Sequence, residues 1–157
     1  MKAALEMAML RDRQPPPRQE NEVMELHLET LCRAYVDGLN TRRLSLSDPV
    51  WESIAPWFKA CLDFPTLDRN CPFSFAGYLE IFSRASSRRP SYYLKITDIV
   101  INVDGQSAQV YITMQSSGLH PGGLETVDAS HLSFGFFDGE WLCVRLEILR
   151  GIGSGQV

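Results

Sequence analysis

Asp128 and Ser130 are the polar residues of this sequence that are best placed for chemistry on a small molecule. They belong to an alternating run over residues 125–137, and their side of that run is otherwise apolar: Leu132, Phe134 and Phe136. Alternate residues of a strand project to the same face, so this side should face the core. Burial would disfavour the charged form of the Asp128 carboxyl, the condition for a general acid or base near neutral pH. The alternative is that Asp128 lies near the strand end and meets solvent or an arginine.

Two tyrosines offer phenol groups that can donate hydrogen bonds to a developing oxyanion. Tyr92 has the same parity as Leu94 and Ile96 and should face the interior, so we take it with Asp128 as a catalytic candidate. Tyr111 alternates with three polar residues and should therefore lie with them on the outer or subunit-facing surface. The three are Gln109, Thr113 and Gln115.

The rest of the expected substrate-binding lining combines a few polar groups with apolar side chains, as small-molecule pockets do. Ser130 and Asn40 would orient the substrate, and Tyr35 would join them. The alternatives are core packing for Tyr35 and a helix cap for Asn40. Apolar contacts would come from a further set of residues: Leu94, Phe75, Phe82, Leu132 and Phe134.

The histidines do not predict a metal site. His27, His120 and His131 each lack a second histidine or carboxylate at ligand spacing, and His131 has the parity opposite to Asp128. The sequence contains no glycine-rich phosphate loop, nucleophile elbow or dinucleotide fingerprint. We therefore expect chemistry without a cofactor.

The first half of the chain has helical patterns that would place these residues. Apolar residues recur at three- and four-residue steps over residues 21–40, which predicts an amphipathic helix. Asp48 followed by Pro49 predicts a second, short helix over residues 48–55, and residues 74–86 predict a third. Between them, residues 57–64 and 70–73 are suited to a small hairpin around residues 67–69.

After Pro90 the period changes to strict alternation. Runs over residues 92–103 and 107–117 flank one Asp-Gly pair, and runs over residues 125–137 and 140–149 flank another. Asp-Gly between β-rich runs is a strong hairpin signal. The sequence therefore predicts a meander of four long strands.

This order of elements resembles the nuclear transport factor 2-like superfamily, in particular its SnoaL-like cyclases and isomerases and scytalone dehydratase. The resemblance is carried by residues 31–40 (LCRAYVDGLN), 54–56 (IAP), 75–82 and 137–141 (FDGEW), and it extends over about residues 22–150. It implies an α+β fold in which a cone-shaped, curved antiparallel sheet wraps around three N-terminal helices, enclosing a hydrophobic molecule.

In an overlay on the dehydratase, its pocket serine and asparagine fall on Asp128 and Ser130. Its histidine falls on Leu94, and its acidic residue after the first helix falls near Asn40. The resemblance therefore implies a pocket, but it argues against dehydration through a His-Asp pair.

Length and charge point to one domain over residues 21–150, preceded by a mobile leader over 1–20 and followed by a flexible tail over 151–157. At 157 residues the chain can bury a core without disulfides, and its net charge of −4 argues against nucleic acid as a partner. No apolar run is long enough for a membrane span, so we expect a cytoplasmic protein. The four cysteines should be buried thiols, although Cys61 and Cys71 are close enough in sequence to form a disulfide across the small hairpin.

Two functions remain open at this stage. The first is a cofactor-independent isomerase or cyclase acting on a hydrophobic polycyclic or polyketide-like molecule. The second is a non-catalytic binding or dimerisation module, because fold does not fix function. An open cone with Asp128 and Tyr92 inside would favour the enzyme, and a cone filled by phenylalanines (Phe75, Phe82, Phe134 and Phe136) would favour the module. In either case the outer face of the sheet should form a homodimer.

Overall fold

The computed structural model describes residues 18–62, 72–119 and 122–150. Most of the expected leader, the expected tail, the turn of the small hairpin, Cys71 and His120 lie outside these residues. Within the described part no helix is long and apolar enough to cross a membrane.

The long helix α2 spans Arg18–Asn40 and ends at the predicted residue. Its buried residues follow the three- and four-residue steps of the sequence: Leu28, Cys32, Tyr35, Val36 and Leu39. That spacing gives one apolar stripe, so the helix has a single way to lie on the sheet.

The second predicted helix is wrong beyond its first turn. Asp48 does accept a hydrogen bond from the backbone of Val50 at 3.0 Å, but the helical segment is only the 3-10 turn η1, Pro49–Trp51. Strand β1, Ile54–Leu62, follows at once. The cap at Asp48 forms as its sequence indicates, but the hydrogen bonds available to β1 from the last strand end the helix early.

The small hairpin is also not the main pairing of this segment. Strand β1 pairs in parallel with β5, and Phe73 meets Ala60 through one antiparallel bridge with hydrogen bonds of 2.7 and 2.8 Å. The sheet is therefore mixed, whereas the sequence predicts a purely antiparallel one.

Helix α3, Phe75–Arg88, packs beside β1, the edge strand of the sheet. The Ser74 hydroxyl caps it by accepting from the Gly77 backbone at 3.2 Å. Its buried face is largely aromatic and apolar: Phe75, Tyr78, Leu79, Phe82 and Ser86.

The meander matches the alternation closely: β2 is Tyr93–Asp104, β3 is Ser107–Ser117, β4 is Thr126–Phe137 and β5 is Glu140–Arg150. Both Asp-Gly turns contain a glycine with positive φ, 61° at Gly105 and 83° at Gly139, as tight hairpins require. The strand order is β1-β5-β4-β3-β2.

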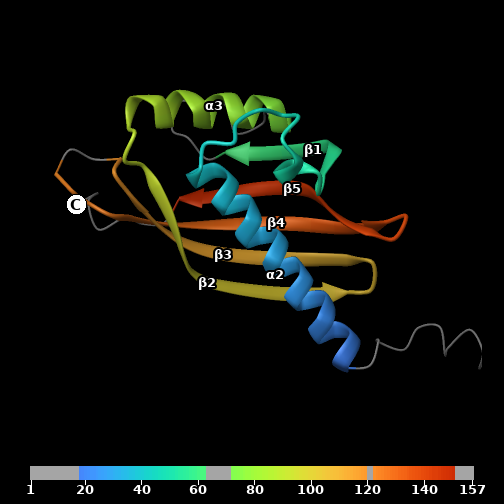
Figure 1. Cartoon of the computed structure of the whole chain (residues 1–157). Coiled ribbons are helices and arrows are strands. Elements are labelled where there is room, and N and C mark those ends of the chain that lie inside the picture. Colours follow the sequence, from blue (N-terminus) through green and yellow to red (C-terminus); the bar gives the residue numbers. More distant parts are fainter. Residues whose placement is uncertain (1–17, 63–71, 120–121, 151–157) are drawn as a thin grey trace, which may run out of the picture.

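The curved sheet has two different faces. Helix α2 runs diagonally across one of them and α3 lies beside β1 (Figure 1). On this inner face, alternate residues of β3 are buried, from Ala108 to Ser116. The opposite, outer face is left uncovered by the described helices.

Candidate functional site

The inner face carries a polar group of side chains at one end of β3 and β4. Asp128 lies opposite Met114 in the β3–β4 register, and Met114 is buried. The predicted inward parity of Asp128 is therefore what the structure shows, and the carboxyl is half-buried. The Ser116 hydroxyl lies 3.2 Å from Asp128 Oδ2 and 2.5 Å from Thr126 Oγ1.

Tyr92 lies directly before β2, with its ring against Phe82 at 5.6 Å between centroids. Burial raises the pKa of its phenol, and the nearby charges of Tyr78 and Asp128 raise it further, while Arg42 opposes them. Tyr92 is thus a neutral phenol within electrostatic range of Asp128.

Tyr35 and Tyr78 form a buried pair that sequence reasoning did not find. Tyr35 Oη donates to Tyr78 Oη at 2.7 Å, and each residue is only 6% exposed. Burial raises the pKa of Tyr78 to about 12, although its bond with Tyr35 lowers it. Burial, followed by the electrostatic interaction with Tyr78, raises the pKa of Tyr35 well above its ordinary value.

The pair leaves one hydrogen-bond donor unused. Two hydroxyls carry two protons, and the bond between them uses the proton of Tyr35. Among the hydrogen bonds of the described residues, none has the Tyr78 hydroxyl as its donor. The helical spacing of Tyr78 with Phe75 and Phe82 did indicate an inward position, but only the packing of α2 against α3 brings the two hydroxyls together.

Asn40 has a structural partner. Its amide nitrogen donates to the Leu94 carbonyl at 2.8 Å, and its amide oxygen accepts from the Leu94 N–H at 2.8 Å. Arg42, just beyond the end of α2, donates to the Tyr92 carbonyl at 2.5 Å and lies over the Phe82 ring. The end of α2 is therefore fastened to the start of β2, and most of the hydrogen-bonding capacity of Asn40 is used there.

The expected apolar lining belongs to one continuous core. Its members are buried, and they include the lining residues named above: Phe75, Phe82, Leu94, Leu132 and Phe134. Phe136 is partly buried against the same core. Ser130 is buried between Ile112 and Ile148, its neighbours in the sheet register.

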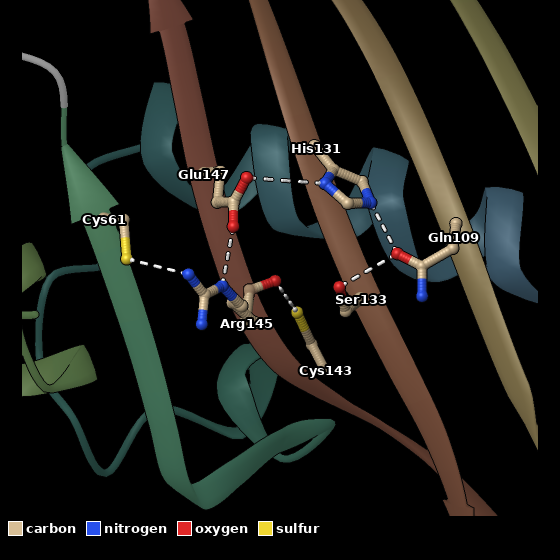
Figure 2. A network of polar contacts seen from close by, with 7 residues as sticks. All are labelled: Cys61, Gln109, His131, Ser133, Cys143, Arg145 and Glu147. Atoms are coloured by element: carbon tan, nitrogen blue, oxygen red, sulfur yellow. Dashed lines mark hydrogen bonds and ion pairs between the residues drawn. The ribbon is translucent and has the colours of Figure 1, made fainter.

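The outer face is more polar than the expected dimer surface. Figure 2 shows His131 between two partners, with Nε2 2.5 Å from Gln109 Oε1 and Nδ1 3.7 Å from Glu147 Oε2. Glu147 also pairs with Arg145 at 2.7 Å, and Arg145 reaches the Cys61 sulfur at 3.4 Å. Other members of this network are Ser133 and Cys143.

Apolar groups are nevertheless exposed on the same outer face. Tyr111 is 49% exposed and stacks on the His131 ring at 4.6 Å. Val100, its register partner on β2, and Val127 on β4 are also exposed. Tyr111 and His131 therefore lie where their parity predicted, on the face away from Asp128.

Metal ligation has no support in the described part of the chain, where no three His, Cys, Asp or Glu residues are grouped. Cys32, Cys61 and Cys143 are free thiols. Burial raises the pKa of Cys32 to about 12, so this thiol is unsuited to nucleophilic chemistry at neutral pH.

Comparison with solved structures identifies the architecture. A protein from Pseudomonas putida KT2440, described as NTF2-like and of unknown function, superposes with a TM-score of 0.66 at 9% identity, covering 85% of this chain and 91% of that one. The fold is the nuclear transport factor 2-like cone. The same cone occurs in a point variant of Rv3472, a protein of unknown function from Mycobacterium tuberculosis, with a TM-score of 0.66 at 16% identity and coverages of 86% and 76%.

A third cone comes from Novosphingobium aromaticivorans DSM 12444 and is provisionally named a scytalone dehydratase. It has a TM-score of 0.65 at 11% identity and covers 87% of this chain and 90% of that one. The sequence itself matches no protein-family profile and no curated protein. At these identities the likeness concerns the nuclear transport factor 2-like fold alone.

Proposed function

We propose that the protein is a cofactor-independent isomerase or cyclase that binds a hydrophobic, carbonyl-containing polycyclic or polyketide-like molecule on the inner face of the cone. The observation that carries the proposal is the half-buried carboxyl of Asp128, which lies within electrostatic range of the partly buried phenol of Tyr92, in a core that also holds the buried pair Tyr35 and Tyr78. We further propose that residues 21–150 act as one domain and that the protein is cytoplasmic.

In the proposed chemistry, the Asp128 carboxyl transfers the proton and the phenols stabilise the negative charge that develops. Asp128 takes a proton from a carbon next to the carbonyl, and the electron pair moves to the carbonyl oxygen. In an unsaturated ketone, returning the proton to the far carbon of the conjugated enolate moves the double bond. In a molecule with a second carbonyl, the enolate carbon attacks the carbon of that group, its C=O π bond breaks, its oxygen takes up the proton from Asp128, and a ring closes. Neither route needs an oxidant or a reductant.

The phenols would stabilise the oxygen on which charge develops. Because their pKa values are raised, they remain protonated and act as hydrogen-bond donors at neutral pH. The unused proton of Tyr78 would go to that oxygen, with Tyr92 as a second donor and Tyr35 supporting Tyr78. Ser130 would contact the substrate, while Asn40 would act by holding Leu94.

The test uses a reaction step rather than a known product. A panel of polycyclic ketones with exchangeable α-protons is incubated with the protein in D2O, and deuterium uptake is measured by mass spectrometry. A positioned carboxylate accelerates proton transfer by about 10²–10⁴-fold, so Asp128→Asn should lose acceleration of that order. Asp98→Asn, on the exposed outer face, is the matched control. An Asp128→Asn protein that exchanges as fast as the wild type refutes the proposal.

A second candidate function is a non-catalytic binding or dimerisation module. It is favoured by the burial of Phe75, Phe82 and Phe134 within the continuous core. If no ketone of the panel exchanges or binds in a thermal-shift assay, the module is the better description.

We also propose a homodimer through the outer face, where Val100, Tyr111 and Val127 are exposed. Tyr111→Lys should convert the dimer to a monomer in light scattering coupled to gel filtration. Leu124→Lys changes an exposed apolar residue in the loop before β4 and should leave the dimer intact. A wild-type monomer contradicts this proposal.

A further inference from the structure

Ser116 connects the candidate catalytic carboxyl to a second hydroxyl. It is only 1% exposed and lies opposite Thr126 in the β3–β4 register, on the same inner face as Asp128. Its Oγ is 2.5 Å from Thr126 Oγ1, 3.4 Å from the Thr126 carbonyl oxygen and 3.2 Å from Asp128 Oδ2. A single hydroxyl therefore faces three oxygens with one proton to donate.

The protonation state of Asp128 decides where that proton goes. An ionised carboxylate only accepts hydrogen bonds, so its contact with Ser116 is favourable only when Ser116 donates. The Thr126 hydroxyl then donates to Ser116 Oγ, and the chain runs from Thr126 through Ser116 to Asp128.

The hydrogen bonds from Asp128 through Ser116 to Thr126 can also point in the opposite direction. When Oδ2 of Asp128 carries a proton, Asp128 donates to Ser116 Oγ, and Ser116 turns its own proton to the Thr126 carbonyl. Rotation of the Ser116 hydroxyl is enough for the change, because Thr126 goes on donating to Ser116 Oγ and every donor in the chain keeps an acceptor in both states.

We propose that Ser116 and Thr126 form a reversible hydroxyl chain that positions the Asp128 carboxyl in both of its protonation states. Ser116 is thus a positioning residue, acting through Asp128 without touching substrate. The importance of the chain for turnover rests on the role proposed above for Asp128. An acid-base residue of an isomerase must be held equally well before and after it takes up the proton, and this chain supplies such support.

Few other described groups act on this carboxyl. Tyr92 lies within electrostatic range and Arg42 acts on Tyr92 from the end of α2. On β3 the neighbours of Asp128 are Met114 and Ser116, and its register partner on β5 is Arg150. Among the described residues, Ser116 alone forms a side-chain hydrogen bond with Asp128.

The first test follows the Asp128 carboxyl carbon by NMR in protein labelled with 13C-aspartate, over a pH titration and without any ligand. In Ser116→Ala the ionised carboxyl loses a charge-assisted hydrogen bond, so its titration midpoint should rise by about half to one pH unit. Thr126→Val removes a partner that serves both states and should move the midpoint by less than half as much. Ser133→Ala, a hydroxyl of the same strand on the outer face, should titrate like the wild type.

The second test needs no variant. Neutron diffraction from wild-type crystals should place the Ser116 deuterium toward Asp128 at high pD and toward Thr126 at low pD. A deuterium that points to Thr126 at both values, or an unchanged midpoint in a folded Ser116→Ala protein, overturns the chain.

The two proposals can fail separately. Slow deuterium exchange in Asp128→Asn together with a failed chain test would leave the function standing. Unchanged exchange in Asp128→Asn with a reversing Ser116 deuterium would leave the chain standing as a feature of the fold.

Discussion

Replacing Asn40 by alanine should destabilise the protein by about 2–6 kcal/mol. Asn40 makes two hydrogen bonds of 2.8 Å to the backbone of Leu94, one to its carbonyl and one from its N–H. Leu94 is buried, and its strand β2 is the last in the sheet order, so no further strand can replace these bonds. Leaving a buried polar group without a partner costs about 1–3 kcal/mol, and two groups are affected.

The measurement is equilibrium unfolding in urea, supported by thermal unfolding. For a chain of this size, each kcal/mol lowers the midpoint temperature by about 2–4 °C, so we expect a loss of roughly 4–24 °C. Thr41→Val is the matched control because the Thr41 hydroxyl bonds only to exposed or partly buried carbonyls of its own helix. Its cost should stay within about 0.5 kcal/mol.

The variant Asn40→Asp distinguishes the contributions of the two hydrogen bonds between Asn40 and Leu94. The aspartate keeps an acceptor for the Leu94 N–H but places a negative charge against the Leu94 carbonyl, so it should be no more stable than Asn40→Ala. If Asn40→Ala instead unfolds like the wild type and loses only ligand binding, Asn40 is a substrate-binding residue and the structural role of its amide is refuted.

Three further predictions concern the rest of the fold. Gly118→Ala should cost more than about 2 kcal/mol in urea unfolding, because its Cβ would lie 2.2 Å from the Ser91 carbonyl oxygen at a φ of +80°. The free energy of unfolding should fall between pH 10 and 12, because the unfolded chain releases the Tyr78 proton near 10 whereas the folded protein holds it to about 12; a flat profile in that range would contradict the buried pair. Cys61, which is half-buried, should react with iodoacetamide in the native protein before Cys32, and mass spectrometry that finds the reverse order would contradict the burial of Cys32.

Local sequence signals predicted the meander well. Alternation and the two Asp-Gly turns placed all four of its strands to within one residue of the observed bounds. Each of these strands pairs with a neighbour in sequence, so the information needed is short-range. The prediction for residues 54–62 is wrong because their partner, β5, lies at the other end of the chain.

The site was predictable only in part, for a related reason. Strand parity is a local property, and it placed Asp128 on the inner face. The pairing of Tyr35 with Tyr78 depends on how α2 and α3 lie against each other. The apolar periodicity of a single helix does not contain this information. The clamp of Asn40 on Leu94 similarly joins residues far apart in sequence, so the sequence alone is compatible with a cap or with a ligand group at this asparagine.

The parallel pairing of β1 with β5 has a consequence for the order in which the protein folds. Residues 54–62 are synthesised before the meander, but their main partners, residues 143–148, lie in its last strand. The strands of the meander can pair through local turns, whereas β1 must wait for its parallel partner until β5 has been made. The segment most exposed to misfolding is therefore β1, and a truncation that removes β5 would leave β1 without its sheet.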